Sequence, residues 1–139
     1  MMYHNDIRDR IGFALRQFVK QNGLGHVTLE ADFQLSEDMV RRPDVVFIGA
    51  EKMATINPHE LLRVAPDLAI EVASPSDRPD DLMLKVKQYL IAGTAIVLVI
   101  SPEAHLGYLY RGQGSAQVTE AGPIELLPGF RIDLDEALR

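Results

Sequence analysis

The feature that most constrains the fold is AIVLVIS, residues 95–101, an almost continuous run of apolar side chains. A helix that crosses a bilayer needs about 20 such residues, so this run is far too short to span a membrane. Short apolar runs of this kind are typical of a central β-strand that is buried on both faces. The chain is therefore expected to form a sheet with helices packed on it.

The other segments supply the remaining parts of such a fold. Some carry apolar side chains at helical spacing. Others alternate apolar and polar side chains, or begin with proline, as strands do. At 139 residues, the chain is expected to form one domain, 1–139. We predict helices at 3–21 and 79–92, strands at 26–35, 43–48, 67–73 and 95–101, a hairpin of 105–111 with 115–119 around 112–114, and a tail at 123–139 that turns at Pro128-Gly129 and closes in a short helix.

The composition excludes several classes of protein. The chain has no cysteine, which excludes disulfides, thiolate nucleophiles and cysteine-ligated zinc. The polar N-terminus MMYHNDIRDR lacks the apolar segment of a signal peptide, so we expect a cytoplasmic location and no membrane association. A formal net charge of −6 argues against a protein that coats nucleic acid electrostatically. It does not argue against a nucleic-acid enzyme, because carboxylates that await a metal ion add to the negative charge.

Two carboxylates stand out from the rest because they occur in apolar strands. Asp44 opens the strand at 43–48, and Glu71 lies inside DLAIEVA at 67–73. A buried glutamate is costly unless it is paired or bound to something, and the small residues Ala69 and Ala73 on its face leave room for a ligand. The alternative is that Glu71 faces solvent on an edge strand while its immediate neighbours face inward.

The helix at 79–92 supplies a basic side chain for the same region. Lys85 lies on the flank of the predicted buried stripe, and Lys87 lies further toward the solvent side. Lys85 is therefore better placed to direct its amine toward the sheet, although a lysine there can also cover apolar surface with its aliphatic stem. The stripe itself consists of Leu82, Val86, Tyr89 and Leu90.

Three motifs together carry a family resemblance. They are R-x-P-D-V at 41–45, I-E-V-x-S-P-S at 70–76 and D-L-x-x-K-x-x-x-Y-x-x-x-G at 81–93. Over residues 40–102 the chain resembles the Uma-type restriction endonuclease family of the PD-(D/E)XK nuclease superfamily. The resemblance implies an α/β fold with a restriction-endonuclease-like core, in which a mixed sheet is flanked by helices and followed by a C-terminal β-hairpin.

The same resemblance implies a metal-dependent DNA endonuclease that hydrolyses phosphodiester bonds. Asp44 and Glu71 match the two acidic positions, which would bind Mg²⁺ or Mn²⁺ and act in catalysis. Position 73, where the superfamily has lysine, is Ala73. The family supplies this lysine from the following helix, where Lys85 matches it and Lys87 stays open as the alternative.

Three further residues are candidates for the same site. Glu30 is a candidate additional acidic member, although plain strand alternation also explains it. Arg41 and Arg42 directly precede the proline-aspartate pair and are candidates for contacts to the phosphates of DNA. The alternative for these arginines is a solvated pair before the strand.

Two rival functions stay open. Leu98 and Ser101 replace a tryptophan and an aspartate that the family often has, and the N-terminal segment is short. A catalytically diverged protein of the nuclease fold would then serve as a nucleic-acid or protein binding module. An unrelated enzyme that uses histidine is the other rival. It has little support, because the four histidines, His4, His26, His59 and His105, do not have the spacing of metal ligands. The sequence also has no glycine-rich phosphate loop of the Walker type.

Assembly is the last expectation. Leu84 and Ile91 lie on the side of the 79–92 helix opposite the predicted stripe. They would form a second packing surface, either within the chain or in a homodimer. Nucleases that act on duplex DNA often work as dimers, so a homodimer is expected by analogy.

Overall fold

The structure is a computed structural model that describes residues 2–112, 116–120 and 122–139. Its helices are α1 (Met2–Gln21), α2 (Ala50–Met53), α3 (Pro79–Ala92) and α4 (Leu134–Ala137). Its strands are β1 (Gly25–Leu29), β2 (Phe33–Ser36), β3 (Met39–Arg41), β4 (Val45–Gly49), β5 (Leu68–Val72), β6 (Ile96–Ser101), β7 (Leu106–Arg111), β8 (Gln117–Thr119), β9 (Pro123–Leu127) and β10 (Phe130–Asp133).

Six strands form a mixed sheet in the order β1–β4–β5–β6–β7–β8. β5 and β6 run parallel and are connected through α3, whereas the other neighbouring pairs are antiparallel. The predicted central strand is β6, and β5 beside it is buried along its whole length. The predicted mixed α/β fold with flanking helices and a C-terminal hairpin is confirmed.

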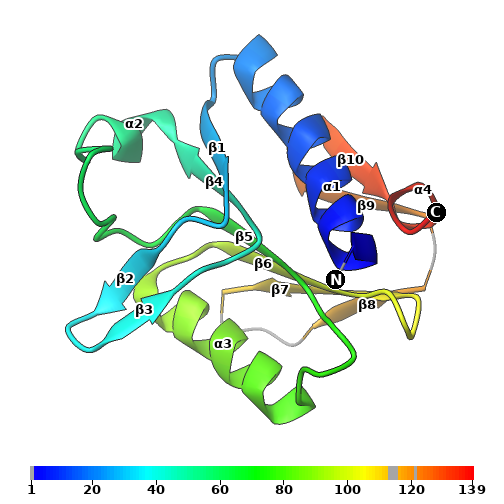
Figure 1. The fold of residues 1–139 in the computed structure, drawn as a ribbon. Helices are drawn as coiled ribbons and strands as arrows, with labels where there is room; N and C mark the ends of the chain where they lie inside the picture. Colours follow the sequence, from blue (N-terminus) through cyan, green and yellow to red (C-terminus); the bar gives the residue numbers. More distant parts are fainter. Residues whose placement is uncertain (1, 113–115, 121) are drawn as a thin grey trace.

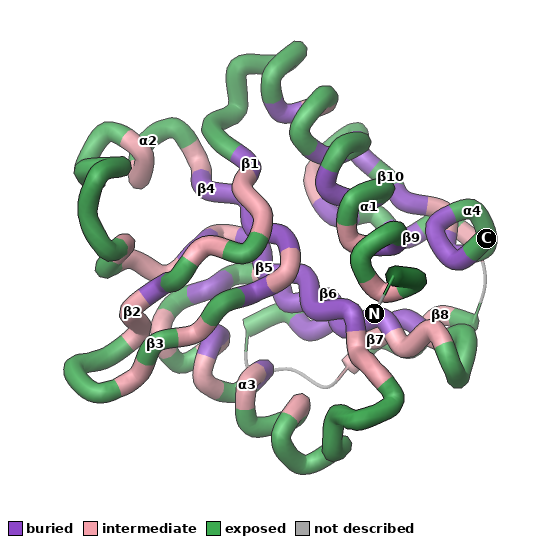
Figure 2. The backbone as a smooth tube through the Cα atoms, in the orientation of Figure 1, coloured by how far each residue is buried: buried purple, intermediate pink, exposed green. Residues whose placement is uncertain are grey.

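Two layers of helix cover the two faces of this sheet. Figure 1 shows α1 on one face, together with β9, β10 and α4, and α3 on the opposite face. Alternate strand residues divide between the two cores: Val45, Phe47 and Ile70 pack with the α1 layer, and Val46 and Ala69 pack with the α3 layer. Figure 2 shows that the buried backbone is concentrated along β5 and β6.

The α3 helix begins and ends where the sequence indicated. Pro79 occupies the first turn, where its missing N–H costs nothing, and Asp80 and Asp81 lie near the positive end of the helix dipole. Gly93 ends the helix with a φ of 113°, in the left-handed region that glycine adopts without a Cβ clash. Signals in the local sequence therefore determine both ends of α3, the helix that carries Lys85.

The prediction of one strand over 26–35 is wrong. The structure has two strands there, because Glu30 adopts a φ of 54° and turns the chain between β1 and β2. β2 then leaves the main sheet and pairs with β3, which the sequence did not indicate. Alternation alone missed the break, because apolar residues recur at every second position on both sides of it.

The remaining expectations concern smaller elements. The helix α4 confirms the predicted closing helix, and β7 with β8 confirms the predicted hairpin. Most of the predicted hairpin turn, 112–114, falls outside the described residues. The four-residue α2 lies in a stretch that the sequence left irregular. Among the described helices, none has the length and apolar character to span a membrane.

Candidate active site

Strand pairing brings Asp44 and Glu71 together. The antiparallel register of β4 and β5 ends with Val45 opposite Ile70, and its continuation by one residue places Asp44, just before β4, opposite Glu71. Side chains directly opposite in such a pair have Cβ atoms about 5 Å apart. Glu71 lies on the face that α3 covers, because it alternates with Ala69 of that core and contacts Tyr89 of α3. Asp44 precedes β4, and its carboxylate contacts the backbone of β5 and His4 of α1. β5 is an interior strand, so the alternative of a solvent-facing Glu71 on an edge strand is wrong.

Glu71 is held in a buried position by α3. Its side chain is only 6% exposed, and the Tyr89 hydroxyl donates a 2.7 Å hydrogen bond to its Oε2 atom. Burial raises the pKa of Glu71 to about 7, whereas the Tyr89 hydrogen bond and the charge of Lys85 act to lower it. In turn, burial and the adjacent carboxylate raise the pKa of Tyr89, which keeps its hydroxyl protonated as a donor.

Asp44 is fixed by the backbone of β5 and by α1. The amide of Val72 donates a 2.7 Å hydrogen bond to Asp44 Oδ2, and the Nε2 atom of His4 lies 3.5 Å from the same oxygen. Burial raises the pKa of Asp44, and the nearby charge of Glu30 adds to this rise, while Val72, His4 and Lys85 oppose it. The two facing carboxylates thus share a partly dehydrated environment.

Lys85 and Lys87 differ in what they can reach. Lys85 is half-buried, and its positive charge lowers the pKa of both Asp44 and Glu71. It lies one helical turn before Tyr89, which contacts Glu71, so both side chains extend from the same flank of α3. Lys87 is exposed. The geometry therefore favours Lys85 as the lysine of this site.

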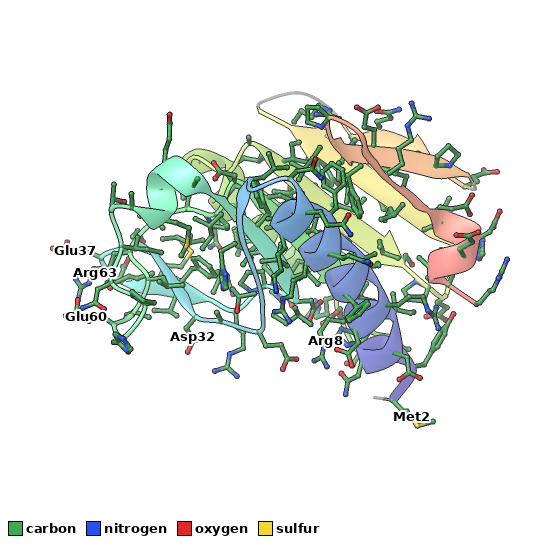
Figure 3. All side chains as sticks on the ribbon, turned by 90° about the horizontal axis from the view of Figure 1, so that it is seen from above. Met2, Arg8, Asp32, Glu37, Glu60 and Arg63 are labelled. Atoms are coloured by element: carbon green, nitrogen blue, oxygen red, sulfur yellow. The ribbon has the colours of Figure 1, made fainter. Side chains whose placement is uncertain are left out.

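Glu30 lies beside Asp44 in the backbone, but its side chain turns away. Its amide donates to the Asp44 carbonyl at 3.2 Å. Because its φ is positive, the carboxylate faces α1 and forms an ion pair with Arg8. Figure 3 labels Arg8 on α1 and Asp32 in the loop that leads into β2. Glu30 therefore affects Asp44 through its charge, while its carboxylate is held by the helix.

The two arginines before β4 have different partners. The Nε atom of Arg41 donates a 2.8 Å hydrogen bond to the side chain of Gln88 on α3, and its charge acts on Tyr89. Arg42 is exposed and forms a two-point contact with Asp32, at 2.9 and 3.3 Å. Arg41 is thus held against α3, where its charge acts on Tyr89, the partner of Glu71, whereas Arg42 is exposed.

The donor set suits a hard divalent cation. Tyr89 occupies one oxygen of Glu71, and Val72 and His4 occupy one oxygen of Asp44. Among the described residues, the second oxygen of each carboxylate has no hydrogen-bond donor. Mg²⁺ commonly binds one or two carboxylates and completes its shell with water and phosphate. Within the described part of the chain, no group of three or more His, Cys, Asp or Glu side chains forms a fuller metal cage.

The comparisons with known proteins identify the family and the fold of the chain. A family model described as "Uma2: Putative restriction endonuclease" matches residues 2–137, almost the entire chain. The chain belongs to the Uma2 family. The crystal structure of a protein from Anabaena variabilis ATCC 29413, described as a putative nuclease belonging to DUF820, superposes on this Uma2 chain with a TM-score of 0.88. The two chains are 17% identical over 98% of this chain and 80% of that chain, a level that shows the shared fold alone. No curated protein matches the chain.

The sequence did not indicate three side chains around the candidate site. His4 was named only among the histidines without metal-ligand spacing, but it contacts Asp44. Tyr89 was assigned to the buried stripe, and Gln88 was not considered. A signal for Tyr89 was available, because a buried tyrosine hydroxyl needs a hydrogen-bond partner and Glu71 was the buried carboxylate. No local signal could place His4, since its contact joins the first turn of α1 to Asp44, just before β4.

Proposed function

We propose that this Uma2 protein is a metal-dependent nuclease that hydrolyses phosphodiester bonds in DNA, with Mg²⁺ or Mn²⁺ as cofactor. One arrangement carries the proposal, in which Asp44 just before β4 lies beside Glu71 of β5 and the charge of Lys85 acts on both carboxylates. Among the described residues, one oxygen of each carboxylate has no protein donor. Two carboxylates and one lysine are the groups that this chemistry requires from the protein.

The protein side chains hold these groups in fixed orientations. Tyr89 fixes Glu71 through Oε2, and the Val72 amide fixes Asp44 through Oδ2. The two remaining oxygens would hold the cation. A bound divalent cation lowers the pKa of a coordinated water and offsets the negative charge of a phosphate. Because the carboxylates are already oriented, little reorganisation is needed when the cation and substrate arrive.

The basic residues would act on the phosphate. Lys85 is half-buried next to both carboxylates, so its compact charge can stabilise the negative charge that develops on the phosphate oxygens. Arg41 is held by Gln88 of α3 and is the better candidate of the two arginines for a contact to the phosphate backbone of DNA. Arg42 would have to release Asp32 before it could bind phosphate.

A cleavage assay tests the proposal. Purified protein is incubated with plasmid and with single-stranded DNA in Mg²⁺ or Mn²⁺, beside Asp44→Asn and Glu71→Gln, which keep side-chain shape and remove charge. Both variants are expected to lose activity by about a hundredfold or more, the scale typical for loss of a group that stabilises the transition state. Wild type without activity in either ion, or full activity in both variants, would contradict the proposal.

The two lysines provide a matched control. Lys85→Met is expected to lose at least about tenfold in cleavage rate, because it removes the cation beside the phosphate. Lys87→Met removes an equal charge from an exposed position two residues away and is expected to cleave at the wild-type rate. DNA binding without cleavage in wild type would instead support the diverged binding module.

A further inference from the structure

A cavity of about 300 Å³ opens next to the carboxylate site and has no assigned role. It lies between α3 and the strands β6 and β7, and its lining includes Ala73, Leu82, Val86, Val99, Tyr108 and Tyr110. Ala73 directly follows β5, and Ser101 at the end of β6 also borders the cavity. The cavity therefore lies at the carboxyl ends of the two parallel strands, where open α/β sheets commonly bind ligands.

The cavity lies one strand away from Glu71 of the candidate active site. Val99, in its lining, is the direct register partner of Glu71 across β5 and β6. The next strand contributes Tyr108, which pairs with Val99. Since neighbouring strands are about 4.8 Å apart, Tyr108 lies roughly 10 Å from Glu71 along the sheet. A ligand group in the cavity would thus be about one nucleotide away from a phosphate at the carboxylates.

The two flanks of α3 face different sites, the carboxylates on one side and the cavity on the other. Lys85 and Tyr89 extend toward β4 and β5, where they act on Glu71. Leu82 and Val86 line the cavity on the other flank, toward β6 and β7. One helix can therefore hold a phosphate on one side and an apolar group on the other.

The lining chemistry selects among possible occupants. Tyr108 and Tyr110 are two residues apart on β7, so both rings lie on the α3 face of the sheet. The Tyr110 hydroxyl donates to the weak acceptor Met83 Sδ, at 3.2 Å, its one partner in the described part of the chain, and Ser101 is also in the lining. Among the residues that the structure describes, no charged side chain lines the cavity. An uncharged, flat ring with polar edges fits this lining, whereas a phosphate or a charged peptide does not.

We propose that this cavity binds an unpaired nucleobase of the strand whose phosphate lies at Asp44, Glu71 and Lys85. The substrate is then a nucleic acid that presents an unstacked base, from a single strand or from a distorted duplex. This inference rests on the proposed nuclease function, because it takes the position of the phosphate from that site. A base within an intact duplex is stacked and cannot enter a pocket until it is extruded. Aromatic stacking of an unpaired base contributes about 1–3 kcal/mol.

Binding measurements with and without bases test the proposal. The probe is fluorescein-labelled oligothymidine, compared with the same sugar–phosphate chain lacking bases and with an oligothymidine–oligodeoxyadenosine duplex, all in Ca²⁺ with gels to verify that the probes stay intact. We expect wild type to bind the single strand about five- to a hundredfold more tightly than the base-free chain. It is also expected to bind the single strand more tightly than the duplex.

Two variants probe the cavity by opposite changes. Tyr108→Leu removes a ring from a half-buried position, and Ala73→Leu fills the space. Both are expected to lose most of the preference for the strand with bases, while binding of the base-free chain stays unchanged. Phe13→Leu, which removes an aromatic ring 72% exposed on α1, is the matched control and is expected to behave as wild type. Thermal unfolding verifies that each variant is folded.

The outcomes separate this inference from the proposed function. Equal binding of the base-bearing and base-free chains by wild type overturns it, and so does a preference that Tyr108→Leu and Ala73→Leu both retain. Cleavage in Mg²⁺ combined with either result leaves the nuclease function standing without the base pocket. A base preference lost in both variants, in a protein that neither binds Mn²⁺ nor cleaves, supports the pocket and contradicts the nuclease function.

Discussion

The substitution Glu71→Gln in metal-free protein should change how stability depends on pH. Folding buries Glu71 and raises its pKa from the ordinary 4.5 to about 7. The folded protein therefore binds this proton more tightly than the unfolded chain does. The stabilisation is fully present below pH 4.5 and is lost as the pH rises toward 7. Glutamine resembles the protonated carboxyl in shape and cannot ionise, so the variant should lack this loss.

The size of the effect follows from the pKa difference. From 4.5 to about 7, at about 1.4 kcal/mol for each pH unit, wild type should lose about 3 kcal/mol relative to Glu71→Gln. The two proteins should be within about 1 kcal/mol of each other at pH 4.5, and the variant should be the more stable at pH 8. Asp44 and the other carboxyl groups occur in both proteins, so the difference isolates Glu71.

Urea unfolding in the presence of EDTA, followed by circular dichroism from pH 4.5 to 8, measures this difference. Parallel curves for the two proteins across the range would refute the reasoning, as would wild type gaining stability over the variant at high pH. Added Mg²⁺ at pH 8 should stabilise wild type alone, because only its carboxylate pair carries the charge that binds the cation.

Two more predictions concern contacts around the site. Tyr89→Phe removes the donor to Glu71 and should lower stability by about 1–3 kcal/mol at pH 8, with a smaller loss at pH 5, where the carboxyl is protonated. Tyr110→Phe, which removes only a contact to sulfur, should show no such pH dependence in the same urea experiment. Glu30→Gly should be more stable than Glu30→Ala by about 1 kcal/mol in thermal unfolding, because both lose the Arg8 ion pair but only alanine must adopt the positive φ. Equal stability of these two variants would argue against a strained backbone at Glu30.

Local signals predicted the parts of the fold that local interactions determine. The helix at 79–92 matches α3 at both ends, because proline, aspartate and glycine act there through their own backbone preferences. The strand predicted at 26–35 failed for the opposite reason. The positive φ at Glu30 occurs where β1 ends beside β4 and α1 supplies Arg8, and alternation in the sequence contains no trace of these partners.

The site could be predicted only in part. The apolar context of Glu71 indicated a costly buried carboxylate, and helical spacing placed Lys85 near the sheet. The pairing of Asp44 with Glu71 depends on which strands become neighbours, so it came from the family resemblance. The contact of His4 with Asp44 depends on how α1 docks against the sheet, and no sequence pattern reports that.

A crystal structure of the protein soaked in Mn²⁺ tests the central claim most directly. The prediction is an anomalous density peak bound by the carboxylates of Asp44 and Glu71, at the oxygens that Val72 and Tyr89 leave free. The absence of a peak there, with both carboxylates keeping only their protein hydrogen bonds, would contradict the assignment of this pair as a metal site.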